Sequence, residues 1–222
     1  KKHIENAIFM DLDKVSNQNA NLTHNHFLPK KENWEQELSL IGISNNSTVV
    51  IYDNSELISS CRIWFQFLYF GHQSDLVYVL DGGLKKWILE NRKVSDKKVQ
   101  NITSKYIAKE NKNMIKIKSQ IENNINTKEF TIMDARSKKR FLGLESEPRA
   151  DVMSGSIENS KSLPFNELIN RKTNTFIGKK DLKKKFDSAG IKGLKIVSSC
   201  GSSVTAATLA LAYLLINDNY TP

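Results

Sequence analysis

The 222-residue sequence is poor in cysteine and proline, with two and four residues respectively, and it lacks long apolar runs. Two cysteines are too few for a disulfide framework, so the sequence indicates a protein of a reducing compartment. The longest apolar runs, such as residues 206–216, are shorter than the roughly 20 residues of a membrane-spanning helix. We therefore expect a soluble protein without membrane contact. The 39% hydrophobic content also excludes a disordered chain.

Sequence motifs for metals and nucleotide cofactors are absent too. There is no Cys-x-x-Cys, His-Glu-x-x-His or Gly-x-Gly-x-x-Gly, so we expect chemistry without a metal or a cofactor. Positive charge is in excess, because 33 Lys and Arg stand against 24 Asp and Glu. The excess charge favours anionic ligands in general, but because these residues are scattered, a composition that keeps the protein soluble is the better explanation, and nucleic-acid binding is not predicted. The one long cluster, at residues 179–185, predicts a solvated helix face.

A strand, a small-residue loop and a helix occur twice, about 150 residues apart. The apolar strand pattern of residues 48–53 returns at 194–200, and predicted helices follow at 60–70 and 204–216. Asp53 ends the first strand and Cys200 ends the second. Strands that alternate with helices predict an α/β fold of two tandem modules, each a parallel sheet flanked by helices.

The segment between the two copies, residues 91–113, is polar and predicts a linker. We place the modules at residues 1–107 and 108–222. The strand and turn at residues 76–83 have no counterpart after the second copy, and the strand at 131–136 has none before the first. We therefore expect both modules to be truncated at their outer ends.

Cys200 is the candidate nucleophile. Successive N–H groups of the loop after it, together with the N-terminus of the next helix, would stabilise an anion, as a reactive thiolate requires. The loop and the first helical turn comprise Gly201, Ser202, Ser203, Val204 and Thr205. The alternative is a small buried cysteine at a strand end. Cys61 lies inside the first predicted helix, where we expect it to pack in the core.

The order of motifs around Cys200 resembles the catalytic module of tandem rhodanese-fold sulfurtransferases. These motifs are Asp134-Ala135-Arg136, Arg140-Phe141-Leu142-Gly143, Glu147-Pro148-Arg149, Gly155-Ser156-Ile157 and Cys200-Gly201-Ser202-Ser203. The first copy resembles the inactive module of the same family, through His26-Phe27-Leu28-Pro29, Tyr52-Asp53 and Leu80-Asp81-Gly82-Gly83. The resemblance covers essentially the whole chain. The uncharged Cys-Gly-Ser loop is most similar to the 3-mercaptopyruvate branch, because the thiosulfate branch typically has basic residues there.

The resemblance implies a two-step sulfur transfer. Cys200 would take sulfur from 3-mercaptopyruvate as a persulfide, release pyruvate, and pass the sulfur to a thiol or a thioredoxin-like dithiol. Arg140 and Arg149 match the two arginines that hold the 2-oxo acid. The loop of residues 201–205 would hold the persulfide.

The resemblance also implies a proton relay. Ser202 matches a loop serine that acts on the substrate, supported by a His and an Asp of the first module. Those two match His26 and Asp13, with His24 as a nearby competitor for the histidine.

Two other functions stay open at this point, and a third is disfavoured by one residue. Thiosulfate sulfurtransferase shares every step except the donor, and a non-catalytic rhodanese-type module would bind without reacting. A cysteine phosphatase would need Arg where the sequence has Ala206. We expect a cytoplasmic protein or, in a eukaryote, one of the mitochondrial matrix.

Overall fold

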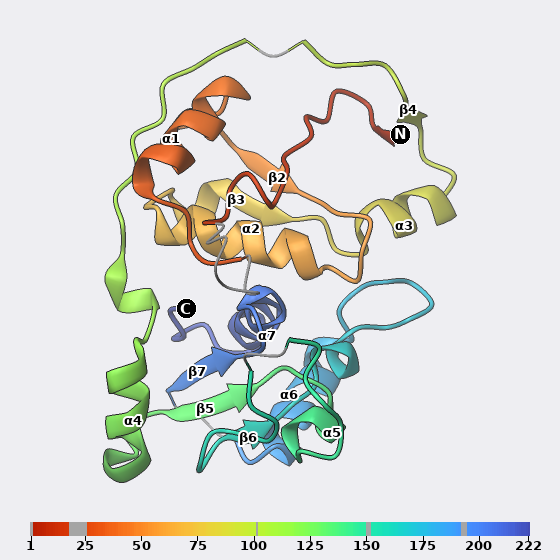
Figure 1. Ribbon diagram of the computed structural model, residues 1–222. Helices are drawn as coiled ribbons and strands as arrows, with labels where there is room; N and C mark the ends of the chain where they lie inside the picture. The colour runs from red at the N-terminus through yellow and green to blue at the C-terminus, as the bar shows by residue number, and fades with distance from the viewer. Residues whose placement is uncertain (1, 18–25, 101, 150–151, 192–194) are drawn as a thin grey trace.

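The computed structural model describes residues 2–17, 26–100, 102–149, 152–191 and 195–222, and Figure 1 shows it in two halves. In the N-terminal half, β2 (Val49–Ile51) and β3 (Val77–Val79) pair in parallel. In the C-terminal half, β6 (Lys161–Ser162), β5 (Thr131–Asp134) and β7 (Ile196–Ser199) form a parallel sheet in that order. A further antiparallel pair joins β1 (His3–Ile4) to β4 (Val94–Ser95). The predicted α/β class with parallel sheets is confirmed.

Helices cover these sheets. The α-helices are α1 (Lys31–Leu40), α2 (Ile58–Tyr69), α3 (Gly83–Leu89), α4 (Lys118–Thr127), α5 (Lys138–Phe141), α6 (Lys179–Ser188) and α7 (Val204–Leu214). The short 3-10 helices are η1 (Ser74–Leu76), η2 (Lys112–Met114) and η3 (Phe165–Leu168). The helices predicted at 60–70 and 204–216 are confirmed as α2 and α7, to within two residues at each end. Within the described residues, no helix has the length and apolar character to cross a membrane.

Helix α7 belongs to both halves. Its sequence is rich in Ala and Leu, which favour helix, and it is apolar on all sides, as a buried helix is. Ala207 and Ala210 join the core of the N-terminal half, whereas Leu209 and Ala212 join that of the C-terminal half. In Figure 1, α7 lies between α2 and the strands β5 and β7, and α2 and α7 pack directly together.

The two cores confirm two predictions about single segments. Trp34 stacks on Phe70 with ring centroids 5.0 Å apart in the N-terminal core, to which the fully buried Cys61 also belongs. Burial raises the pKa of the Cys61 thiol, so this cysteine is a packing residue, as expected. In α6, Leu182 and Phe186 face the C-terminal core, and the lysines of the run are on the solvated side.

The end of the predicted linker is attached to the N-terminal half. The main-chain N–H groups of Lys109 and Asn111 donate to the carbonyl oxygens of Phe70 (2.9 Å) and Tyr69 (2.7 Å). From there the chain runs along one side of the molecule to α4 (Figure 1). The module boundary at residues 107 and 108 and the truncated outer ends stay predictions.

Candidate active site

The carboxyl ends of β5 and β7 meet at one edge of the C-terminal sheet. The two strands pair in parallel, with Asp134 opposite Ser199, and the N–H of Ala135 donates to the Ser199 oxygen at 2.8 Å. Cys200 follows β7 directly and Arg136 follows β5 after one residue. The strand register therefore brings two distant motifs of the sequence to one place.

Cys200 is half-buried and forms no disulfide. The loop after it ends at Ser203, whose φ of 62° lies in the left-handed region, and α7 begins at the next residue. Val204 is buried in the first helical turn, and Thr205 is half-buried. The sulfur is thus at the amino-terminal end of an 11-residue helix, where N–H groups without helical partners and the helix dipole favour an anion.

Arg140 and Arg149 converge on the loop next to Cys200. A methyl group on the Gly201 Cα would lie 3.1 Å from Arg140 Nη2 and 3.1 Å from Arg149 Nη1. Glycine therefore leaves room for both guanidinium groups beside the residue that follows the cysteine. The resemblance assigns these two arginines, nine residues apart in sequence, to the substrate, and that role stays a prediction.

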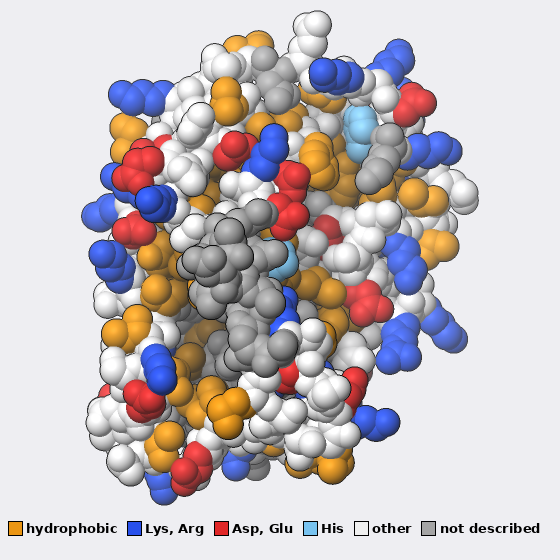
Figure 2. Space-filling view, in the orientation of Figure 1, with side chains coloured by type: hydrophobic (Ala, Val, Ile, Leu, Met, Phe, Trp, Pro, Cys, Tyr) orange, Lys and Arg blue, Asp and Glu red, His pale blue; other side chains and the backbone are white. Residues whose placement is uncertain are grey.

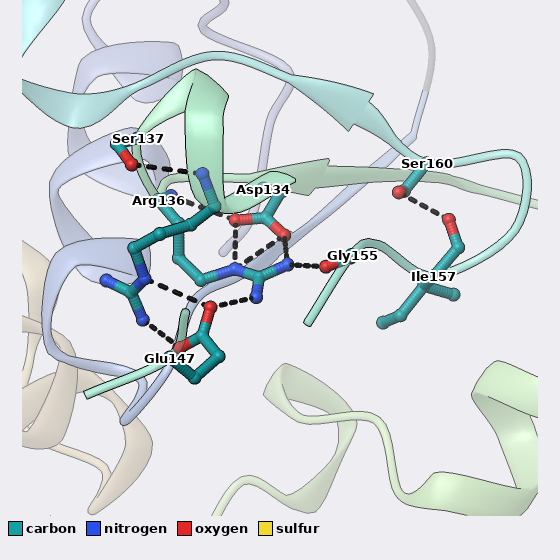
Figure 3. Close-up of polar contacts among 8 residues, drawn as sticks. Asp134, Arg136, Ser137, Glu147, Gly155, Ile157 and Ser160 are labelled. Atoms are coloured by element: carbon teal, nitrogen blue, oxygen red, sulfur yellow. Dashed lines mark hydrogen bonds and ion pairs between the residues drawn. The ribbon is translucent and has the colours of Figure 1, made fainter. Parts of the chain in front are cut away.

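Glu147 connects two arginines at this site (Figure 3). Its Oε1 accepts from Arg136 Nη1 at 2.7 Å and from Arg140 Nε at 3.0 Å, and its Oε2 accepts from Arg140 Nη2. Arg136 in turn pairs with Asp134, Nη2 to Oδ2 at 2.6 Å, and donates to the Gly155 oxygen at 2.7 Å. The network fixes the direction in which the Arg140 side chain extends.

The charges of this network stabilise one another. The hydrogen bond that Arg140 donates to Glu147 is the main reason why the pKa of Glu147 is lowered, and the one that Arg136 donates to Asp134 is the main reason why the pKa of Arg136 is raised. The side chain of Glu147 is only 2% exposed. Glu147 is therefore a carboxylate at neutral pH, held between two guanidinium groups.

His26 and Asp13, the pair that the resemblance assigns to the proton relay, lie next to each other. Nε2 of His26 lies 3.4 Å from Asp13 Oδ1. The other ring nitrogen, Nδ1, is buried and has no hydrogen-bond partner. Ser202 is half-buried in the Cys200 loop, and no hydrogen bond joins it to His26 in the part of the chain described. His24, the competing histidine, lies outside the described residues.

A cavity of about 1330 Å³ lies where the two halves meet. Cys200, Ser203, His26 and Arg62 are part of its wall, and Arg140 and Arg149 are not, so the two arginines face the cysteine loop from outside this cavity. In Figure 2, a histidine side chain lies near the middle of the face shown, with hydrophobic, basic and acidic side chains around it. Arg62, from α2, is buried, and burial is the main reason why its pKa is lowered to about 10.

The N-terminal half has a corresponding loop with a different content. Asp53 follows β2 after one residue, and its carboxylate accepts from Ser55 N (3.2 Å), Ser55 Oγ (2.8 Å) and Ser60 N (2.9 Å). The buried side chain of Asn174, from the other half, covers this loop and donates to the main-chain oxygens of Ser55 (2.8 Å) and Gly82 (3.2 Å). A side-chain carboxylate thus occupies the anion position of this loop.

Three residues at the site received no role from the sequence. Glu147 and Arg136 stand inside the motifs that carried the resemblance, and the alternation of Arg, Glu and Arg at 140, 147 and 149 was a signal for an ion-pair network. Arg62 follows Cys61 and opens the stretch Arg62-Ile63-Trp64, by which the first copy also resembles the inactive module, but the sequence gives it no role. A lone arginine in an apolar helical stretch is a weak signal, because such a residue usually extends to solvent. No group of three or more metal-binding side chains occurs within the described ranges.

Comparisons with known proteins identify the family. Residues 1–90 match the rhodanese-like domain family. The chain is 36% identical to "Thiosulfate/3-mercaptopyruvate sulfurtransferase 1, mitochondrial" of Arabidopsis thaliana over 94% of its own length and 60% of that protein's. It is 32% identical to the 3-mercaptopyruvate sulfurtransferase of Mus musculus, over 100% of the chain and 74% of the relative.

The fold agrees with these similarities. The crystal structure of a 3-mercaptopyruvate sulfotransferase from Escherichia coli superposes with a TM-score of 0.85 at 25% identity, covering 97% of this chain and 79% of the other. The chain spans 60% and 66% of the lengths of two Arabidopsis thaliana relatives. The match to the mouse protein covers 100% of this chain and therefore spans both halves. The chain belongs to the rhodanese-fold sulfurtransferase family.

Proposed function

We propose that the protein transfers sulfur from 3-mercaptopyruvate, through a persulfide on Cys200, to a thiol acceptor. One observation carries the proposal: two guanidinium groups converge at Gly201, beside a half-buried cysteine at the start of a helix. A pair of guanidinium forks suits the carboxylate and keto oxygen of a 2-oxo acid. The names of the mouse and Escherichia coli relatives support the same donor.

In the first step, the Cys200 thiolate attacks the sulfur of 3-mercaptopyruvate. A sulfur–sulfur bond forms as the carbon–sulfur bond breaks, and the electron pair of the broken bond leaves on carbon as the enolate of pyruvate. Arg140 and Arg149 hold the substrate and stabilise the charge that develops on its oxygen. Glu147 positions Arg140 for this contact.

A proton balances this step. The enolate takes up one proton to become pyruvate, and the outer sulfur of the persulfide loses the proton of the substrate thiol. We assign this proton movement to Ser202, with His26 as its base and Asp13 as the group that orients the imidazole. Support comes from the 3.4 Å approach of His26 to Asp13 and from the second ring nitrogen, which has no other hydrogen-bond partner.

In the second step, an acceptor thiolate attacks the outer persulfide sulfur and Cys200 leaves as a thiolate. The N–H groups of residues 201–205 stabilise the sulfur anion before and after this transfer. A small thiol and a thioredoxin-like dithiol both provide the required nucleophile. We further propose a reducing compartment, the cytoplasm or, in a eukaryote, the mitochondrial matrix, since both cysteines are free.

Thiosulfate is the second candidate donor, because the Arabidopsis thaliana relatives carry both donors in their names. The loop of residues 201–205 contains no charged side chain, which disfavours a dianionic inorganic donor relative to a 2-oxo acid. The distinction is therefore one of donor preference at the same cysteine.

The test measures pyruvate and sulfide release from 3-mercaptopyruvate with a thiol, against sulfite release from thiosulfate with cyanide. Cys200→Ala should abolish both activities, and Cys61→Ala is the matched control because Cys61 is buried in the core. A clear preference for thiosulfate would replace the proposed donor. Inactivity of the folded wild type with both donors would leave a non-catalytic binding module as the better explanation.

A further inference from the structure

Arg62 is a buried cation without a carboxylate partner in the described part of the chain. It comes from α2 in the N-terminal half, and only 2% of it is exposed. Its Nη2 donates to the main-chain oxygen of His26 at 2.9 Å, whereas its Nε is buried without a hydrogen-bond partner. Among the described residues, no Asp or Glu forms an ion pair with it.

A buried guanidinium group needs a negative charge nearby, because the protein interior solvates it less well than water does. Burial lowers the pKa of Arg62, whereas the negative charge of the Cys200 sulfur has the opposite effect and raises this pKa. Arg62 and Cys200 also belong to the wall of the same cavity. The Cys200 sulfur, in the C-terminal half of the molecule, can therefore supply the negative charge that Arg62 lacks.

The neighbouring ionisable groups have other contacts. His26 faces Asp13, Arg140 is paired with Glu147, and Asp53 is bonded to its own loop. Arg149 lies with Arg140 beside Gly201. Cys61 is fully buried in the N-terminal core. Of the other ionisable residues that line this cavity, Lys116 and Lys195 are cations, and Glu129, which the structure describes, forms no ion pair with Arg62. The Cys200 sulfur is the charge that acts on Arg62, so we take it as the counter-charge.

We propose that Arg62 is the counter-ion of the Cys200 sulfur and stabilises first the thiolate and then the persulfide anion. The part that concerns the persulfide rests on the proposed function, whereas the part that concerns the thiolate does not. Arg62 also holds the main chain of His26, so one side chain links the charge at Cys200 with the position of the imidazole. The N-terminal half, which has Asp53 in place of a nucleophile, thereby contributes a charge to the site in the other half.

The experiment follows the rate at which iodoacetamide alkylates Cys200 as a function of pH, with mass spectrometry to locate the label. In Arg62→Met, the pH of half-maximal rate should rise by about one unit, because removal of a nearby cation disfavours the thiolate. Arg62→Lys keeps the charge and should retain most of the wild-type profile. Lys195→Met is the matched control, because it removes an exposed cation from the same cavity wall at the other end of β7. Its profile should equal that of the wild type.

An Arg62→Met profile equal to that of the wild type, in a protein with native circular dichroism, would overturn the proposal. Should that variant fail to fold, the unmutated protein provides the second test. The Nε–H resonance of Arg62 should shift as Cys200 ionises and should stay constant over the same pH range in Cys200→Ser; no difference between the two proteins would contradict the inference. Neither measurement needs a sulfur donor, so failure of the proposed function would not be mistaken for failure of the counter-ion.

Discussion

The two strand-to-helix loops of the molecule share their construction and differ in what they hold. In each, the helix starts after a residue in the left-handed region, Leu57 with a φ of 61° and Ser203 with a φ of 62°. The N-terminal loop holds the carboxylate of Asp53 through its own N–H and O–H groups. The C-terminal loop has a cysteine at the corresponding place, with two arginines beside it. This backbone therefore suits an anion at the strand end, and the side chain decides which anion it is.

The two loops also differ in the residue that the opposite half of the molecule places near them. The first loop is covered by Asn174, which reaches it from beside the bridge between Ile169 and Phe176. The matching bridge in the N-terminal half joins Asn17 to Phe27, next to His26, which lines the cavity with Cys200. Asn174 of the C-terminal half thus donates directly to the main chain of the first loop, whereas His26 of the N-terminal half lines the same cavity as Cys200.

The largest expected effect comes from giving the second loop the side chain of the first. Cys200→Asp should lower sulfur transfer at least about a thousandfold, because the nucleophile is lost. The free energy of unfolding should rise by about 1 kcal/mol, because a carboxylate is then held at the start of α7. Turnover and urea denaturation measure the two effects. A clear loss of stability would show that the two loops are not equivalent hosts for an anion.

Gly201→Ala tests the space between the arginines. The added methyl group would lie 3.1 Å from both guanidinium groups, and Glu147 restrains the withdrawal of Arg140. We expect kcat/KM for 3-mercaptopyruvate to fall about 10- to 100-fold, from misplaced substrate contacts. Asn54→Ala is the control, since Asn54 is the exposed residue after Asp53 in the other loop. Equal activities for the two variants would argue against convergence of the arginines on substrate.

The contribution of the arginine network to the free energy of unfolding should depend on pH in the acid range. The folded pKa of Glu147 is lowered from its ordinary value of 4.5, so its stabilising contribution is present above that pH and is lost as pH falls through the folded value. Glu147→Gln should reduce the free energy of unfolding at pH 7 by about 2 kcal/mol. The difference between variant and wild type should shrink below pH 4.5. Urea unfolding at pH 7 and pH 3.5 checks this, and a constant difference would contradict it.

The smallest effect is expected in the N-terminal loop. Asp53→Ala removes the acceptor of the Ser55 and Ser60 hydrogen bonds and should cost about 1 kcal/mol of stability. Sulfur transfer should be nearly unchanged, because Asp53 lies in the loop that Asn174 covers. Thermal unfolding and steady-state kinetics measure the two quantities. If turnover fell by more than the fraction of unfolded protein accounts for, this loop would have a part in the chemistry.

Much of the fold could be predicted because local signals and tertiary structure agree. The strand predicted at residues 194–200 is confirmed over Ile196–Ser199 as β7, with residue 194 outside the described residues, and the helix after it is confirmed as α7. An apolar run before a small-residue loop has few other solutions. The proximity of His26 to Asp13 followed only from the resemblance, because residues so far apart carry no local signal of contact. The convergence of Arg140 and Arg149 on one glycine had the same origin.

The role of Glu147 and the place of Arg62 could not be predicted from periodicity. The role of Glu147 follows from its hydrogen bonds with the guanidinium groups of Arg136 and Arg140, and these contacts form only when three separate segments pack together. Arg62 stands in a helix whose pattern predicts apolar burial, and only the packing of α2 against α7 leaves it in a cavity wall without a carboxylate. Such contacts arise from tertiary packing between the halves.

A helix shared by two cores also governs cooperativity. Because α7 gives opposite sides to the two hydrophobic clusters, neither half can lose its native packing without exposing apolar surface of the other. We expect a single sigmoidal transition on heating rather than two. Cys200 immediately precedes the loop that leads into this helix, so its reactivity should persist up to the melting temperature and vanish with the fold as a whole.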